Sequence, residues 1–140
     1  RFSAGTGIRH SEFNPSAEEE VHLLQIWILP ERKGLSPGYE QKRFDLSKTG
    51  RLILLGSRDG RENSVTIHQD ADLYYGAAAE DQSLEFSSDP GRHAWIQVIE
   101  GALEVNGIEL SAGDGAAIKE ESQLNIKGAE EGSFLLFDLK

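Results

Sequence analysis

The sequence predicts an all-β domain, built as a barrel or a two-sheet sandwich with little helix. Short runs rich in branched and aromatic residues recur along the chain, and turn signals separate them at close spacing. Apolar residues almost never repeat with the helical period, and 15 glycines among 140 residues supply the tight turns. A chain of this length fits one domain with a normal hydrophobic core.

The first strand is expected at residues 21–29, which are dense in branched and aromatic side chains and end before Pro30. Just before it, Ser16 and Glu19 have the spacing of a capping box for one short helical turn. Residues 1–16 differ in character, because they are rich in glycine and serine and then polar. We interpret them as the end of one element followed by a connector.

Further strands are expected at residues 51–55 and 65–67, on either side of a turn-rich segment. Residues 95–99 and 102–105 form another pair, with Gly101 as a bend or bulge between them. Asn106-Gly107 then predicts a tight hairpin back to Ile108.

Two strands complete the prediction at the end of the chain. Residues 123–127 alternate, which places Leu124 and Ile126 on one face of a strand. Residues 134–139 form a final apolar strand.

The composition excludes several kinds of partner. Asp and Glu outnumber Lys and Arg by 24 to 14, which gives a formal net charge of −10. Nucleic acids and anionic membranes attract basic surfaces, so neither is expected as a partner. No apolar stretch has the length of a membrane span. The absence of cysteine suits a reducing compartment, and we expect a cytoplasmic protein.

Residues 3–12, Ser-Ala-Gly-Thr-Gly-Ile-Arg-His-Ser-Glu, resemble a stretch of pirin-like proteins, a family of two-cupin proteins. In that family the stretch ends the metal-binding core of the first cupin. Residues 23–28 and 39–41 also resemble the family, at the crossing into the second cupin. The run 101–107, followed by Gly113-Asp114, resembles the common cupin hairpin and its turn.

The resemblance implies a cupin-type double-stranded β-helix. Residues 1–16 would be a remnant of the metal-bearing N-terminal cupin plus a connector, and residues 17–140 the C-terminal cupin domain. The chain starts at Arg1 and contains no methionine, so we expect a piece of a longer parent polypeptide.

The resemblance also implies a metal site in the first cupin, held by three histidines and one carboxylate. His10 and Glu12 match the last two of these ligands, and the paired histidines belong to an earlier strand that the chain lacks. In a strand, residues two apart leave the same face and can reach one ion. Their donor atoms suit Fe, Ni, Mn, Co or Zn. We expect no tightly bound metal in this chain alone.

The second cupin is expected to lack a metal site of its own. With the usual cupin spacing, the carboxylate position falls on Ala94 and the histidine positions near Ser88 and Pro90. The remaining histidine position falls on Leu124. Small or apolar residues therefore stand where ligands would be.

The remaining histidines and the aromatic residues have simpler interpretations. His22 is expected on a solvated or domain-contact face, His93 on the surface, and His68 in a structural hydrogen bond. Trp27 and Trp95, like Tyr74 and Tyr75, could line a flavonoid pocket, but aromatic residues of β-barrels more often belong to the core, and we favour that interpretation.

Three functional hypotheses remain open at this stage. Several bacterial members of the family are quercetin 2,3-dioxygenases, which open a flavonol ring with molecular oxygen, so the parent would resemble such an enzyme. Glu12 would then be a ligand that also moves a proton, and the isolated chain would be inactive. Alternatively, the parent is a regulatory, protein-binding module, or the chain is an independent metabolite-binding cupin. Whether the chain is an enzyme is left undecided.

Partners follow from these hypotheses. The domain would contact the N-terminal cupin of the same parent, or a second copy of itself in a homodimer or domain-swapped pair. Residues 1–16 would be the exchanging segment. A flavonoid-like small molecule is the candidate ligand.

Overall fold

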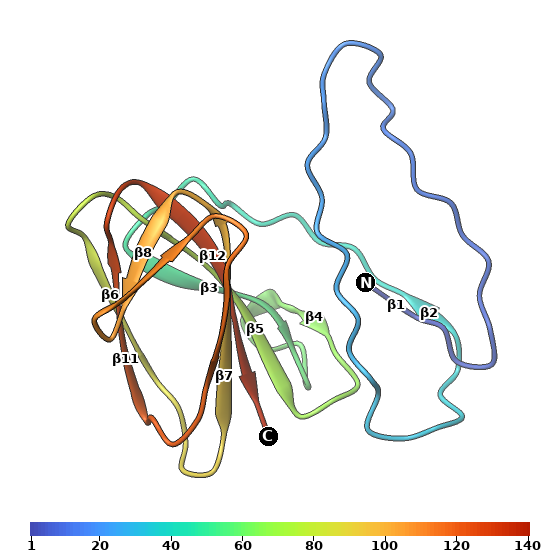
Figure 1. Ribbon diagram of the computed structural model, residues 1–140. Coiled ribbons are helices and arrows are strands. Elements are labelled where there is room, and N and C mark those ends of the chain that lie inside the picture. Colours follow the sequence, from blue (N-terminus) through green and yellow to red (C-terminus); the bar gives the residue numbers. More distant parts are fainter.

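The computed structural model describes residues 1–140 and confirms the all-β prediction. Two larger sheets face each other and form a barrel, while a small two-stranded ribbon and a long loop stand to one side (Figure 1). The one helical element is a 3₁₀ turn, η1 (Arg61–Asn63). No helix is long and apolar enough to cross a membrane.

The larger sheet contains, in spatial order, β10 (Gly115–Ile118), β7 (His93–Glu100), β12 (Gly132–Leu139), β5 (Ala71–Ala78), β3 (Arg51–Ser57) and β4 (Val65–Thr66). The opposing sheet has the order β6 (Ser83–Ser87), β11 (Gln123–Gly128), β8 (Ala102–Val105) and β9 (Ile108–Ser111). The ribbon pairs β1 (Phe2–Ser3) with β2 (Gly38–Tyr39). Neighbouring strands are antiparallel except β3 and β4, which are parallel.

The core lies between the two larger sheets and is made by alternate residues of their strands. Ile96 of β7 and Phe134 and Leu136 of β12 are fully buried from one side, and Leu103 of β8 and Ile126 of β11 from the other. Side chains of this size each stabilise the fold by about 1.5–3 kcal/mol when they are buried. The predicted alternation of residues 123–127 is confirmed by this packing.

The predicted hairpin at Asn106-Gly107 is also confirmed. Val105 pairs with Ile108, and both turn residues have positive φ, +48° at Asn106 and +84° at Gly107, as a type I′ turn requires. The Asn106 amide also accepts a hydrogen bond of 2.8 Å from the Asn125 backbone. The side chain of the turn therefore ties the hairpin to the neighbouring strand β11.

The predicted strand at residues 21–29 is wrong. This run belongs to the long loop between β1 and β2, which reaches away from the barrel (Figure 1). Its composition favours a strand, but no second strand lies beside it to complete a ladder, and Val21, Leu23 and Leu29 are exposed. Ser16 Oγ does accept a hydrogen bond of 2.9 Å from Glu19 N, yet no helix follows this cap.

Three strands of the barrel, β5, β6 and β10, were not predicted. Two of them, β5 and β10, contain glycine residues, which have low strand propensity. These glycines are needed because aromatic rings pack directly against them. A Cβ atom on Gly76 of β5 would lie 2.3 Å from Phe134 Cζ, and one on Gly115 of β10 would lie 2.3 Å from Trp95 Cζ2. The reason for these residues becomes visible only once the strands are paired.

Candidate metal-ligand pair, barrel pocket and outer groove

His10 and Glu12 lie next to each other in the loop that follows β1. The distance from His10 Nε2 to Glu12 Oε1 is 3.7 Å, and the side chains are 41% and 49% exposed. Residues 10–12 are not part of a strand, so the two side chains do not share a strand face. The two side chains nevertheless converge, and the Phe2 ring packs against the His10 ring with centroids 4.4 Å apart.

The ribbon positions this pair through Phe2 and Gly5. Phe2 is opposite Tyr39 in the β1–β2 ladder, and the chain then turns sharply at Gly5, where φ is +56°. A Cβ atom there would lie 2.4 Å from the Leu35 carbonyl oxygen, so only glycine fits. This close approach fixes where the segment carrying His10 leaves the ribbon.

Glu40, directly after β2, fastens the ribbon to the barrel. Its Oε2 atom accepts a hydrogen bond of 2.8 Å from the Thr66 backbone in β4, and Lys42 Nζ lies 3.0 Å from Oε1. The Thr66 hydrogen bond and the Lys42 ammonium group hold the pKa of Glu40 below its usual value. Lys42 in turn donates a hydrogen bond of 2.7 Å to the Ser64 carbonyl oxygen. Nothing in the local sequence pattern marks Glu40, so this anchor was not predicted.

The donor atoms of His10 and Glu12 fit a first-row divalent metal. Imidazole nitrogen and carboxylate oxygen bind such ions at about 2.1 Å, so two donors of one ion lie at most about 4.2 Å apart. The measured separation of 3.7 Å falls within that limit. Two protein ligands are fewer than the three that catalytic sites normally use. No three His, Cys, Asp or Glu side chains of this chain are grouped so that they could hold an ion.

The barrel interior is apolar at two of the four positions where the cupin pattern would place ligands. Ala94 and Leu124 are 6% and 3% exposed and belong to the core cluster. Ser88 Oγ instead donates a hydrogen bond of 2.8 Å to Asp138 Oδ1. Ala94 and Leu124 therefore contribute to the hydrophobic core, and Ser88 to a polar contact with the last strand.

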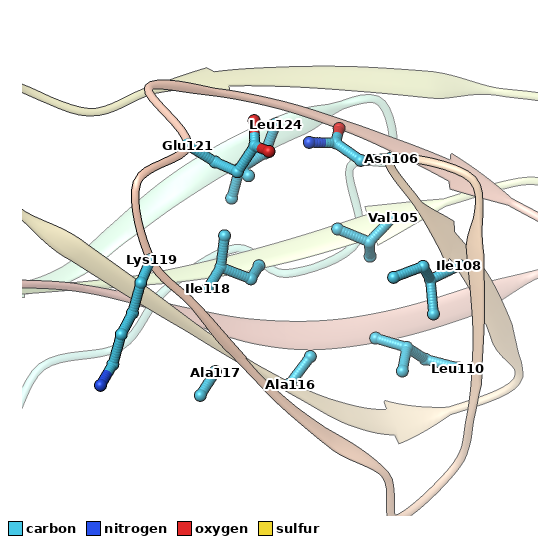
Figure 2. Close-up of a pocket in the computed structure, with 10 residues that line it drawn as sticks. All are labelled: Val105, Asn106, Ile108, Leu110, Ala116, Ala117, Ile118, Lys119, Glu121 and Leu124. Atoms are coloured by element: carbon cyan, nitrogen blue, oxygen red, sulfur yellow. The ribbon is translucent and has the colours of Figure 1, made fainter.

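A pocket of about 290 Å³ opens at one end of the barrel. It lies between the β8–β9 hairpin and β10, with the chain before β11 at its mouth (Figure 2). The residues that line it are mostly apolar: Val105, Asn106, Ile108, Leu110, Ala116, Ala117, Ile118, Lys119, Glu121 and Leu124. Val105, Asn106, Ile108 and Leu124 lie in strands or the hairpin predicted from the sequence, whereas residues 115–118 lack a strand pattern and were not predicted.

A groove of about 490 Å³ lies on the outside of the larger sheet. Its walls are residues 24–28 of the long loop and the outward-facing side chains of β7 and β12, among them Trp95, Leu135 and Phe137. Trp27 is 88% exposed and Trp95 38% exposed, so assigning these tryptophans to the core was wrong. Tyr74, by contrast, packs against the core, with its ring centroid 5.6 Å from that of Phe86.

The other histidines are not brought together. His22 and His93 are exposed, as predicted, and His93 begins β7. The His68 backbone carbonyl accepts a hydrogen bond of 2.8 Å from Glu31 N, so the structural hydrogen bond expected there comes from the main chain.

Comparison with protein families gives two matches. Residues 54–139 match the quercetinase C-terminal cupin domain, and residues 1–28 match the pirin family. The pirin match covers β1 and most of the long loop, the quercetinase C-terminal match covers most of the barrel, and residues 29–53 lie between the two matches.

Curated relatives and solved structures agree with these matches. The chain is 46% identical over 138 residues to a quercetin 2,3-dioxygenase of Escherichia coli K12, covering 99% of this chain and 59% of the relative. It is 31% identical over 139 residues to a pirin-like protein of Caulobacter vibrioides, covering 98% and 60%. The chain thus spans about three fifths of the length of these relatives.

The crystal structure of YhhW from Escherichia coli aligns with a TM-score of 0.91 at 45% identity, over 99% of this chain and 58% of that one. Bacterial pirin YhhW from the same organism, in complex with nickel(II), aligns with a TM-score of 0.90 at 44% identity, over 99% and 59%.

Proposed function

The chain belongs to the family of quercetinase C-terminal cupin domains, and on this premise we propose that it is the metal-free second cupin of a pirin-like quercetin 2,3-dioxygenase. The longer parent would open the ring of flavonols with molecular oxygen. The chain would supply the last two ligands of the metal site, His10 and Glu12, and a rigid barrel behind them.

The observation that carries this proposal is that the two metal-donor side chains, His10 and Glu12, lie outside the barrel. The convergent pair, 3.7 Å apart and half exposed, lies outside a barrel in which the apolar residues Ala94 and Leu124 occupy two of the ligand positions. Exposed side chains that converge in this way are suited to an ion whose other ligands come from outside the chain. The nickel(II) complex of Escherichia coli YhhW supports a divalent metal in the parent, and Fe, Mn, Co and Zn suit the same donors.

The residues of this chain would have distinct roles at that site. The bound divalent ion would supply a Lewis acid that holds the flavonol oxygens close to molecular oxygen. Glu12 would also accept the proton of a flavonol hydroxyl group, since a carboxylate within reach can act as a general base. The Phe2 ring, packed on His10, would fix the orientation of the imidazole.

The outer groove would be the docking surface for the metal-bearing cupin. Trp27 and Trp95 form an apolar surface that the barrel leaves uncovered, and large exposed aromatic residues are typical of interfaces. About two fifths of the relatives' length lies outside the match, which leaves room for such a domain. When that domain is missing, a second copy of the chain would cover the groove.

A flavonol assay on the full-length parent tests the proposal. With each candidate metal and oxygen present, we expect the flavonol absorbance band to disappear, and Glu12→Gln to slow this loss by roughly 100-fold or more, the range of general-base catalysis. Glu18→Gln, an exposed carboxylate of the same loop, should leave the rate unchanged. A band that persists with all five metals would contradict the enzyme assignment and favour the regulatory, protein-binding alternative.

A further inference from the structure

The pocket at the open end of the barrel is built as a ligand site. We propose that it binds a neutral, single-ring aromatic alcohol, a phenol in the simplest case. The inference rests on the pocket alone and uses neither the metal ligands nor the flavonol reaction.

The shape of the pocket follows from which residues are large and which are small. Val105, Ile108 and Leu110 from the hairpin face Ile118 across an open centre (Figure 2). The side chain between them on β10 is only Ala116, and its methyl group leaves the space unfilled. Leu124, which is buried, also lines the pocket at the position where the cupin pattern would place a histidine.

The volume selects the size of the ligand. A dry apolar cavity of roughly 150 Å³ takes up benzene. The pocket measures about 290 Å³, just below the usual range of about 300–1,000 Å³ for drug-sized ligands. One substituted ring therefore fits better than a three-ring flavonol.

The apolar walls favour occupation by such a ring. Ile108 is 67% exposed, and Leu110 and Ile118 are half-buried, so water contacts the apolar side chains around the opening. Covering apolar surface of this kind removes it from water, which is the main favourable contribution to binding of an uncharged ring.

The polar groups at the mouth of the pocket favour a ligand that can donate a hydrogen bond. The carboxylate of Glu121 and the amide of Asn106 both appear at one end of the pocket, whereas Lys119 extends away from it (Figure 2). The Asn106 amide is already bonded to the Gln123 and Asn125 backbone. Glu121 therefore remains as the acceptor, and it would bind a hydroxyl group and repel an anion.

The experiment is a phenol titration of this chain, followed by backbone amide NMR shifts without metal. We expect saturable shifts confined to the hairpin, β10 and the chain before β11. Benzoate should produce none, and quercetin should not compete with phenol. Linear, non-saturating shifts, or benzoate binding as tightly as phenol, would overturn the inference.

Two variants separate the pocket from unspecific binding. Ala116→Leu fills the space and should abolish binding of phenol and toluene alike, while Ala112→Leu, the same change on an exposed turn, should leave both unchanged. Glu121→Gln should weaken phenol binding roughly three- to tenfold, as loss of a charged acceptor does, without altering toluene binding. The Glu121 comparison holds even if Ala116→Leu does not fold. Equal phenol affinity in wild type and Glu121→Gln would overturn the role of the carboxylate.

Discussion

Arg92 Nε donates a hydrogen bond of 2.9 Å to Asp138 Oδ2, and the two side chains are only 16% and 10% exposed. A second Arg92 nitrogen donates to Asp70 Oδ1 at 2.8 Å, and Ser88 Oγ donates to the other Asp138 oxygen at 2.8 Å. The network ties the loop between β6 and β7 to the final strand. The largely buried ion pair between Arg92 and Asp138 therefore stabilises this end of the barrel.

Replacement of Arg92 should destabilise the fold strongly. Arg92→Met leaves the Asp138 carboxylate buried without its cation, which costs roughly 2–4 kcal/mol of unfolding free energy. Arg58→Met removes a similar pair with Glu31, but there the arginine is 59% exposed, so we expect a loss below about 1 kcal/mol. Urea denaturation of both variants checks this, and equal losses would contradict the account.

The same network predicts a dependence of stability on pH. The hydrogen bond from Arg92 holds the pKa of Asp70 below its usual value. A carboxylate with a lowered folded-state pKa stabilises the protein above its unfolded-state pKa, near 3.9, and that contribution is lost as the pH falls through the folded value. Asp70→Asn should therefore lower the urea midpoint at neutral pH, and the difference should vanish in acid.

The control for this titration is Asp89→Asn, which removes an exposed carboxylate from the loop that carries Arg92. Its urea midpoint should follow that of the wild type across the pH range. A midpoint difference for Asp70→Asn that stays constant down to acid would show that charge plays no part.

Gly101 should tolerate no side chain. Its φ is +71°, and a Cβ atom would lie 2.0 Å from the Glu131 carbonyl oxygen. Gly101→Ala adds a backbone clash to left-handed strain, and we expect a loss of more than about 2 kcal/mol of unfolding free energy. Gly107→Ala introduces only the left-handed backbone strain, because no atom lies near its Cβ position. It should therefore lower the unfolding free energy by about 1 kcal/mol. The reverse order in thermal or urea denaturation would refute this explanation.

Much of the barrel can be predicted from local pattern. Residues 123–127 alternate between polar and apolar side chains, because one face of β11 is buried. Asn106 and Gly107 both tolerate positive φ, which a type I′ turn requires at its two central residues. Such signals depend on a few neighbouring residues. Two of the three strands that were missed, β5 and β10, contain Gly76 and Gly115, whose small size is required by aromatic rings that are distant in sequence.

The site is less predictable because its contacts are not local. His10 and Glu12 are recognised through a family motif, and Ala94 and Leu124 through its spacing. Glu40 and Arg92 carry no such mark, since their partners Thr66 and Asp138 lie 26 and 46 residues further along the chain. The exposure of Trp27 was missed for a related reason, because an apolar run looks the same whether it is covered by its own chain or by another.

The exposed tryptophans predict self-association of the isolated chain. We expect a homodimer in light scattering, since Trp27 and Trp95 border an uncovered apolar groove. Trp27→Ser should lower the measured molecular mass toward that of one chain. Leu46→Ser, which changes an exposed residue between β2 and β3, should not do so at the same concentration. A mass of one chain for the wild type across dilution would contradict the prediction.

The most direct test of the metal-ligand assignment is the metal content of the full-length parent, measured by elemental mass spectrometry after dialysis. We predict about one divalent metal per wild-type chain and loss of most of it in His10→Ala and in Glu12→Gln, because each removes one of the few ligands. His22→Ala, which changes an exposed histidine of the same loop, should keep the metal. Full metal content in both ligand variants would contradict the account.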